Sequence, residues 1–356
     1  MKSIRVRLGG GYHVRVGPGL LMQTGTWLKE LGFGDKLVVI TDTTVWGFCG
    51  GVLRQSLASS GFRVLMLEVP EGEEQKSLET AGRLYHRLTE LYAERDTPIL
   101  ALGGGVIGDL GGFVAATYLR GVPLIQLPTT LLAQGDSSIG GKVAVNHGLL
   151  KNKIGAFYQP RLVISDVTSL KTLDNGQLGD GLAEIIKHGA IRDAGLFDFI
   201  EDNIGRIKSL DDKVLETIVS RSVRIKAEVV AQDERDLGLR NILNFGHTVG
   251  HAFETISDFR MRHGEAVAVG MMVAAKISSR LGMLDKGEVD RLRRVLTMAG
   301  LPTEVSGIQP KELIQVMKHD KKIAQGRMKF VLLKSIGEAF VTDKVSPSLV
   351  EEVLVK

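Results

Sequence analysis

Three of the eight histidines in this 356-residue chain, His247, His251 and His263, fall within one short segment. His247 and His251 are spaced i, i+4, which puts both imidazoles on the same face of a helix. Neutral imidazole is the commonest protein ligand for zinc-like ions, and helical spacing fixes the geometry of the donors. Such pairs also occur as ordinary surface or packing residues, but Arg240 and Asn244 add more polar chemistry to this segment than folding requires. The segment therefore favours a metal site.

A carboxylate for the same site is available upstream, in the sequence GLAEIIKH that begins at residue 181. Glu184 and Lys187 are spaced i, i+3, so a surface ion pair is the simplest interpretation. With His247 and His263 downstream, Glu184 could instead complete a Glu/His/His set, whose open coordination positions are typical of catalytic zinc. Sequence spacing alone leaves both interpretations open.

The sequence PILALGGGVIGDLGG, which begins at residue 98, reads as a strand, a glycine turn and a helix start. Glycines at such a turn let backbone N–H groups and the helix N-terminus approach a phosphate. We therefore favour a dinucleotide pyrophosphate over a simple tight turn, although the spacing is not a strict GxGxxG. A second candidate for nucleotide binding is EGEEQK at residues 71–76. One of its carboxylates could bind a ribose diol, or the segment could simply be a solvated loop of charged residues.

The sequence GDSSIGGKV at residues 135–143 is close to a phosphate-binding P-loop but does not fit it. An extra glycine precedes Lys142, and Val143 stands where serine or threonine would hold magnesium, so we exclude a nucleoside triphosphatase. Asp136 and Lys142 remain candidate contacts to substrate or cofactor, with a charged surface turn as the alternative. Lys226, on an apolar helical stretch, is either a snorkelling lysine or a buried anion contact.

Two kinds of element must position these residues in the N-terminal half. Short apolar runs typical of strands alternate there with segments of helical periodicity. The expected strands are a hairpin, Ile4–Leu8 with Tyr12–Val16, and the runs Leu37–Thr41, Arg63–Leu67, Ile99–Leu102, Leu124–Leu127 and Leu162–Ser165. The expected helices include Leu20–Leu31, Val45–Ser60 and Leu78–Tyr92. This alternation predicts an α/β domain with a mostly parallel sheet covered on both faces.

The pattern changes after about residue 168, where helical periodicity takes over. The clearest expected helices are Asp211–Ala231, Gly264–Leu281 and Glu288–Ala299, and a late hairpin is expected over Met328–Lys334 and Ala339–Thr342. A chain of this length can form two cores. We therefore expect an α/β nucleotide-binding domain over residues 1–170 and a mainly α-helical domain over residues 171–356.

The composition excludes several classes of protein. The single Cys49 rules out an intramolecular disulfide and a CxxC motif, and the N-terminal residues lack the apolar region of a secretory signal. No apolar run approaches the roughly 18 residues that span a membrane. The net charge is +4, but the lysines and arginines are scattered among acidic residues, and aromatic residues that could stack on bases make up only 5% of the chain. An anionic small-molecule ligand therefore explains the positive charge better than a nucleic acid does. We expect a cytoplasmic protein with no membrane or nucleic-acid partner.

The chain resembles the 3-dehydroquinate synthase family, a group of sugar phosphate cyclases. The resemblance runs from about residue 71 to 322 and includes several long, specific motifs. In chain order they are GGGVIGDLGGF, LPTTLLAQGDSSIGGKVAVN, LLKNKIGAFYQP, GLAEIIKHGAI, IKAEVV, LRNILNFGHTVGHAFE, HGEAVAVGM and HDKK.

This resemblance implies a Rossmann-like N-terminal domain, a helical C-terminal domain, a homodimer, bound NAD, and zinc or cobalt. The implied metal ligands are Glu184, His247 and His263. The implied NAD contacts are Asp42, Glu73, Lys76, Gly104, Gly105, Val106, Asp109, Thr129, Thr130 and Lys151, with Asp136 and Lys142 near the nicotinamide. The implied substrate contacts are Lys142, Asn152, Lys187, Lys226, Arg240, Asn244, His251 and Lys321, with Arg120 reaching the phosphate bound by the neighbouring subunit.

The implied reaction converts 3-deoxy-D-arabino-heptulosonate 7-phosphate into 3-dehydroquinate and phosphate, in the shikimate pathway. It consists of transient oxidation at C5 by NAD, phosphate elimination, re-reduction, ring opening and aldol closure. The rival interpretations are another sugar phosphate cyclase, of the inosose or valiolone type, and a metal-dependent polyol dehydrogenase, which would release NADH. A non-catalytic basic binding protein would leave the glycine turn and the histidines unexplained.

Overall fold

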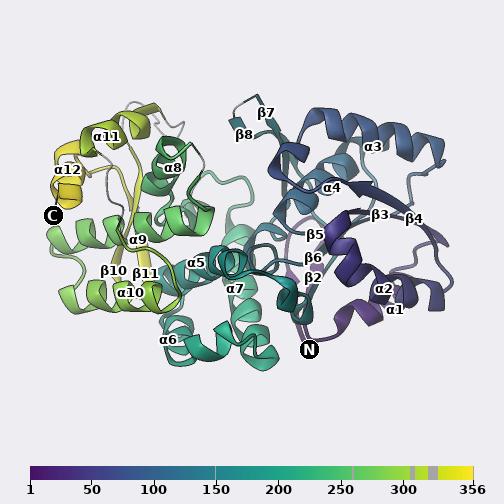
Figure 1. The fold of residues 1–356 in the computed structure, drawn as a ribbon, viewed down its shortest axis with the longest axis horizontal. Coiled ribbons are helices and arrows are strands. Elements are labelled where there is room, and N and C mark those ends of the chain that lie inside the picture. The colour runs from purple at the N-terminus through teal and green to yellow at the C-terminus, as the bar shows by residue number, and fades with distance from the viewer. Residues whose placement is uncertain (149, 259, 305–308, 320–327, 356) are drawn as a thin grey trace. The chain divides into compact units, whose positions relative to one another are not determined.

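A computed structural model describes residues 1–148, 150–258, 260–304, 309–319 and 328–355. The chain divides into two compact units, coloured along the sequence in Figure 1. Unit 1 consists of Met1–Asp174 with Asp212–Arg235, and unit 2 of Asn175–Asp211 with Asp236–Lys356. Among the described residues, no helix combines the length and the apolarity that crossing a membrane requires.

Unit 1 is built on a seven-stranded sheet with the order β1-β2-β9-β6-β5-β3-β4. The hairpin β1–β2 is antiparallel, and the other neighbouring pairs are parallel. The strands are β1 (Lys2–Val6), β2 (Tyr12–Gly17), β3 (Lys36–Asp42), β4 (Arg63–Val69), β5 (Ile99–Gly103), β6 (Leu124–Pro128) and β9 (Leu162–Asp166). Each expected strand of this half is present, which confirms the mostly parallel α/β fold.

Helices cover both faces of this sheet, as Figure 1 shows for the pairs α1–α2 and α3–α4. Alternate residues of β3 enter different cores: Val38 packs with α3 and α4, and Val39 packs with α1 and α2. Because both faces are buried, the central strands read as continuous apolar runs in the sequence. The helical elements are η1 (Leu20–Gln23), α1 (Thr24–Glu30), α2 (Thr43–Ser59), η2 (Glu73–Gln75), α3 (Leu78–Glu90), α4 (Gly105–Thr117), η3 (Tyr118–Arg120), η4 (Ala133–Ser137) and η5 (Val167–Thr172).

Two features of unit 1 differ from the sequence-based expectation. A second hairpin, β7 (Lys142–His147) with β8 (Leu150–Phe157), follows η4 where no strands were predicted. The long helix α7 (Asp212–Gln232) belongs to unit 1 rather than to a domain of residues 171–356. It packs against β1 and β2, and Ser222 Oγ donates to the carbonyl oxygen of Gly135 at 3.0 Å. The chain therefore returns once to unit 1.

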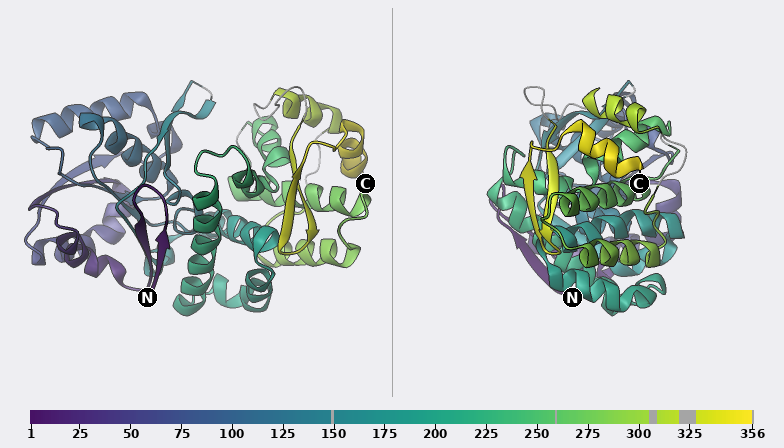
Figure 2. Two further views of the ribbon diagram at one scale, coloured as in Figure 1. Left: turned by 180° about the vertical axis from the view of Figure 1, so that it is seen from behind. Right: turned by 90° about the vertical axis from the view of Figure 1, so that its left-hand side faces the viewer.

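Unit 2 is mainly helical. Its elements are α5 (Asn175–Arg192), α6 (Ala194–Lys208), η6 (Leu239–Asn244), α8 (His247–Ile256), α9 (His263–Arg280), α10 (Lys286–Met298), α11 (Pro310–His319), β10 (Phe330–Ser335), β11 (Glu338–Thr342) and α12 (Pro347–Val355). The largely buried helix α9 contacts α5, α8 and α10, and the hairpin β10–β11 packs against it, as the yellow strands in Figure 2 show. The predicted late hairpin is confirmed.

Candidate functional site

Three residues of unit 2 gather around one carboxylate oxygen. Glu184 lies in the middle of α5 and is almost completely buried, while His247 and His263 are the first residues of α8 and α9. The Nε2 atom of His247 lies 3.4 Å from Oε1 of Glu184, and the Nε2 atom of His263 lies 3.5 Å from the same oxygen. The other oxygen of Glu184, Oε2, accepts from the ammonium group of Lys187.

These separations fit a shared metal ion better than direct hydrogen bonds. An N–H···O bond normally measures 2.7–3.2 Å between the heavy atoms. In contrast, two ligands of a tetrahedral ion with bonds of about 2.1 Å lie about 3.4 Å apart. One candidate ligand atom from each of Glu184, His247 and His263 lies within 4.8 Å of the other two. The donor set therefore fits a divalent ion with three protein ligands.

The two histidines differ in their electrostatic surroundings. Burial, together with the nearby ammonium of Lys187, holds the pKa of His247 well below its usual value, so this imidazole is neutral and can donate a lone pair. Burial also acts to lower the pKa of His263, but the nearby carboxylates of Glu184 and Glu254 outweigh it and raise the pKa to about 10. A metal ion at this position would displace the proton on Nε2 of His263.

Two further carboxylates fix the position of His263. Glu254 is buried in α8, and its Oε1 lies 2.9 Å from Nδ1 of His263, which leaves Nε2 turned toward Glu184. Asp180 stands one turn before Glu184 on α5, and its Oδ1 accepts the backbone N–H of Gly264 at 2.8 Å. Burial raises the pKa of Asp180, and this hydrogen bond partly opposes the shift. One face of α5 thus supplies both a candidate ligand and an anchor for the start of α9.

Glycines let α8 and α9 approach each other closely. Gly246, the N-cap residue of α8, has φ +81°, a conformation that disfavours other residues. A Cβ atom added at Gly270 would overlap the carbonyl oxygen of Gly246, and one added at Gly250 would lie 3.0 Å from the carbonyl oxygen of Ala266. The absence of these side chains brings the two histidine-bearing helices into contact.

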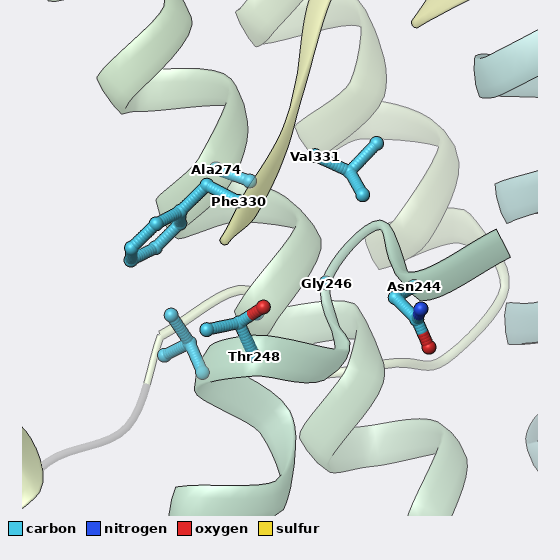
Figure 3. A pocket seen from close by; sticks show the side chains of 8 residues that line it. Asn244, Gly246, Thr248, Ala274, Phe330 and Val331 are labelled. Atoms are coloured by element: carbon cyan, nitrogen blue, oxygen red, sulfur yellow. The ribbon is translucent and has the colours of Figure 1, made fainter. Parts of the chain in front are cut away.

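The remaining sequence-predicted residues of unit 2 that the structure describes lie on α8 and on η6. His251 follows His247 by one turn of α8, with 5.4 Å between the ring centroids. Arg240 is buried in η6, and Asn244 ends η6. Lys321 lies outside the described residues. Figure 3 shows Asn244, Thr248 and Phe330 among the side chains that line a small hollow.

The predicted NAD residues of unit 1 occupy the carboxyl ends of neighbouring parallel strands. Asp42 ends β3, the turn after β5 begins with Gly104, and Thr129 follows β6, where its N–H donates to the carbonyl of Gly103 at 3.0 Å. Gly104, Gly105 and Val106 form the start of α4, and Thr130 packs beside Gly104. This edge of an open α/β sheet is where nucleotides bind, because helix N-termini and loops face it.

Of the predicted NAD residues on this edge, Lys76 and Asp109 form an ion pair. The buried ammonium of Lys76 lies 2.5 Å from Oδ2 of Asp109, although burial of Asp109 raises the pKa of its carboxyl group. Asp42 is also the N-cap of α2, accepting the N–H of Val45 at 2.8 Å, and burial raises its pKa. Glu73 is exposed in η2, which joins β4 to α3.

The predicted substrate residues of unit 1 fall into two groups. Lys226 of α7 is buried, and its Nζ lies 2.6 Å from Oδ1 and 2.8 Å from the carbonyl oxygen of Asp136 in η4, so it contacts a carboxylate rather than snorkelling to solvent. Lys142, Lys151 and Asn152 lie exposed on the hairpin β7–β8, and Arg120 is exposed at the end of η3. Arg120 has φ +66° and Asn152 has φ +53°, conformations that cost energy in residues other than glycine.

Sequence reasoning did not identify Glu254, Asp180 or Asn146, the last of which contacts Glu73 and Asn152. The i, i+4 spacing of Asp180 and Glu184 on one helix is a signal that could have pointed to Asp180. Glu254 and Asn146 belong to no local pattern, because their contacts form only when separate elements meet.

Comparison with known proteins gives one consistent family. The family model described as 3-dehydroquinate synthase N-terminal matches residues 66–180, and the model of the C-terminal part matches residues 181–323. A 3-dehydroquinate synthase from Dehalococcoides mccartyi strain CBDB1 is 52% identical over 346 residues, which cover 97% of this chain and 96% of that protein. One from Desulforamulus reducens is 46% identical over 357 residues, which cover 99% of both chains.

Solved structures with the same fold include two other sugar phosphate cyclases. The 2-epi-5-epi-valiolone synthase from Streptomyces hygroscopicus subsp. jinggangensis, with NAD⁺ and Zn²⁺ bound, gives a TM-score of 0.89 at 28% identity, covering 97% of this chain and 96% of that chain. A 2-deoxy-scyllo-inosose synthase complexed with carbaglucose-6-phosphate, NAD⁺ and Co²⁺ gives 0.89 at 28% identity, covering 99% of both. A glycerol dehydrogenase from Schizosaccharomyces pombe, at 17% identity and TM-score 0.68, covering 96% of this chain and 87% of that chain, shares the fold.

Proposed function

Because this chain belongs to the 3-dehydroquinate synthase family, we propose that it converts 3-deoxy-D-arabino-heptulosonate 7-phosphate into 3-dehydroquinate and inorganic phosphate. The observation that carries this proposal is the 52% identity to a 3-dehydroquinate synthase across 97% of the chain. The other cyclases reach only 28% identity at similar coverage, although they share the fold. The reaction makes the protein a phosphate-eliminating carbon–oxygen lyase of aromatic amino acid biosynthesis.

The proposed cofactors are NAD and one divalent ion, zinc or cobalt. Glu184, His247 and His263 would hold the ion, which leaves coordination positions for substrate hydroxyls. When bound, NAD supplies a reversible hydride acceptor for C5, and the ion supplies a Lewis acid for the hydroxyls at C4 and C5. The NAD⁺ and Zn²⁺ or Co²⁺ bound to the two structurally similar cyclases support this assignment.

The residues of unit 1 would bind NAD along the strand edge. The N–H groups of Gly104, Gly105 and Val106, at the start of α4, can donate to the pyrophosphate. The carboxylates of Asp42 and Glu73 can accept from ribose hydroxyls. The remaining proposed contacts in this unit are Lys76, Asp109, Thr129, Thr130, Lys142 and Lys151.

The substrate carries a phosphate and a carboxylate, so its proposed contacts are mainly cationic. Arg240 presents a planar fork that suits bidentate binding of the carboxylate, whereas lysines suit phosphate as point charges. His251 would donate to a substrate oxygen from the helix that also carries His247. The complete proposed set is Lys142, Asn152 and Lys226 in unit 1, with Asp136 beside them, and Lys187, Arg240, Asn244, His251 and Lys321 in unit 2. Arg120 would reach the phosphate held by the partner of a homodimer.

An assay of two products tests the reaction. The purified chain, supplied with NAD, Zn²⁺ or Co²⁺ and the heptulosonate phosphate, is expected to release phosphate without net accumulation of NADH. Removal of the ion with a chelator is expected to stop phosphate release, and re-addition is expected to restore it. Stoichiometric NADH with phosphate retained would establish a polyol dehydrogenase instead. Turnover of glucose 6-phosphate in place of the heptulosonate would establish an inosose-type cyclase.

Two statements about the enzyme's setting complete the proposal. We place it in the cytoplasm, where its phosphorylated substrate would be made and consumed. We also infer a homodimer, because the role of Arg120 requires a partner subunit. Light scattering coupled to size-exclusion chromatography tests the second statement, and a mass equal to one chain of 38.6 kDa at assay concentration would contradict it.

A further inference from the structure

Asn146 in β7 connects two parts of unit 1 that the proposed function assigns to different ligands. Its Nδ2 donates to Oε1 of Glu73 at 2.8 Å, and its Oδ1 accepts the backbone N–H of Asn152 at 2.8 Å. Its own backbone N–H donates to the carbonyl oxygen of Lys76, also at 2.8 Å. One residue therefore holds both ends of the Glu73–Lys76 turn and the start of β8.

The chemistry of these partners allows only one orientation of the Asn146 amide. The Glu73 carboxylate can only accept a hydrogen bond, and the Asn152 backbone N–H can only donate one. An inverted amide would place oxygen against oxygen and nitrogen against nitrogen. Both partners together thus determine the orientation of the Asn146 amide. If either partner moves, the amide moves with it and its hydrogen bond to the other partner is weakened.

The hairpin is irregular where Asn146 lies. The pairing of β7 with β8 shifts in register between Val145 and His147, so that Asn146 alone faces the three residues 151–153 of β8. Asn152, in the middle of that stretch, has φ +53°, a left-handed conformation that asparagine adopts more readily than most residues, so a few local constraints suffice to hold it. The hydrogen bond from the Asn152 N–H to Asn146 is one such constraint.

We propose that Asn146 is a positioning residue that couples NAD bound at Glu73 and Lys76 to the substrate contact made by Asn152. This inference rests on the proposed function, which assigns those contacts. NAD that engages the Glu73 carboxylate fixes the Asn146 amide, which in turn fixes the backbone of Asn152. The ordering needed by the second ligand is then partly complete, so each ligand strengthens the binding of the other.

The test measures NAD affinity in the metal-loaded protein with and without a substrate analogue. The analogue is the phosphonate in which CH₂ replaces the ester oxygen, because its C–P bond cannot be eliminated. Asn146→Asp keeps the size and the acceptor for Asn152 but turns an oxygen toward Glu73. Asn146→Ala removes both bonds, and His147→Ala changes the adjacent exposed residue as a control.

In the wild-type protein, the phosphonate is expected to tighten NAD binding. Asn146→Ala is expected to reduce the factor by which the phosphonate tightens NAD binding by about tenfold. Loss of the two side-chain hydrogen bonds that connect the sites costs about 1.4 kcal/mol, which corresponds to a tenfold change in affinity. Both Asn146 variants are expected to raise the Kd of NAD and the KM of substrate together, with a smaller change in kcat. His147→Ala is expected to match the wild type, and a thermal unfolding midpoint confirms that each variant is folded.

An unchanged coupling factor in a folded Asn146 variant, or a change confined to one ligand, overturns the inference. If Asn146→Ala does not fold, Asn146→Asp decides by the same criteria. Glu73→Ala separates this inference from the proposed function. Wild-type NAD affinity in Glu73→Ala would refute the cofactor assignment itself. Weakened NAD binding in Glu73→Ala, with coupling intact in the Asn146 variants, would refute only the role of Asn146.

Discussion

Gly270→Ala is expected to destroy the proposed metal centre, although Gly270 holds no ligand. It lies two turns along α9 from His263, which is about 10 Å at 1.5 Å per residue. Its added Cβ would overlap the carbonyl oxygen of Gly246 and lie 3.0 Å from the backbone nitrogen of Gly250. Both contacts belong to the backbone of α8, which cannot rotate away as a side chain can. The two helices must therefore separate.

The size of that separation sets the expected effect. Restoring ordinary contact requires a shift of about 1 Å, whereas metal–ligand distances tolerate only about 0.2 Å. Zn²⁺ affinity is therefore expected to fall at least about tenfold, since one of three protein ligands leaves its position. Overpacking of this kind costs about 1–3 kcal/mol of unfolding free energy, against which alanine recovers at most about 1 kcal/mol of helix propensity.

A graded series of glycine variants makes this test sharper. A Cβ atom added at Gly205 in α6 would have no heavy atom within 4 Å. Gly205→Ala is therefore expected to leave metal binding unchanged and to raise the free energy of unfolding slightly. Gly250→Ala places its Cβ 3.0 Å from the Ala266 carbonyl oxygen, a milder clash than that of Gly270→Ala. Its Zn²⁺ affinity is therefore expected to lie between those of Gly270→Ala and Gly205→Ala. Competition with a chelator gives the Zn²⁺ affinity, and thermal unfolding gives the stability. Wild-type affinity in Gly270→Ala, or an affinity order unrelated to these clashes, would refute the reasoning.

Three more outcomes follow from the site. His247→Ala is expected to abolish metal-dependent turnover and to lower bound metal measured by elemental analysis; wild-type turnover would rule out the ligand assignment. Zn²⁺ binding at pH 8 is expected to release about one proton, because the pKa of His263 near 10 keeps its ring protonated in the metal-free protein, and affinity should rise with pH until that pKa. Calorimetry in two buffers of different ionisation enthalpy measures the release, and a value near zero would contradict the raised pKa. Lys76→Met is expected to destabilise the protein by ~1–3 kcal/mol and to weaken NAD binding, because the half-buried Asp109 carboxylate loses its cation; unchanged denaturant unfolding would show that the ion pair does not contribute to stability.

The sequence predicted the sheet of unit 1 well, because strands buried on both faces appear as uninterrupted apolar runs. It did not predict the hairpin β7–β8. Val143 and Val145 are buried, but Lys151, Asn152 and Lys153 are exposed, so β8 has no apolar run to mark it. The sequence also could not assign α7 to a unit, since helical periodicity shows which face of a helix is buried but not what covers it.

In the candidate metal site, too, some residues could be predicted from the sequence and others could not. The residue types left a Glu184/His247/His263 metal site as one of two interpretations, and the family resemblance implied these three ligands; the structure places the three residues together. The residues that hold them could not be found in this way. Glu254 contacts His263 only because two helices meet, and although the i, i+4 spacing of Asp180 and Glu184 points to Asp180, it does not reveal that Asp180 accepts the backbone N–H of Gly264.

The pairing of the buried lysines with carboxylates bears on how an anionic substrate could bind. Lys187 contacts Glu184, and Lys226 contacts Asp136, which stabilises each ammonium away from solvent. An ammonium group has three donors, so a lysine can keep its carboxylate and still donate to a phosphate or carboxylate of the substrate. A carboxylate beside each lysine also means that no uncompensated positive charge is buried while the site is empty. The acidic partners therefore support, rather than oppose, the assignment of these lysines to the substrate, since they hold each ammonium group in place before the anion arrives.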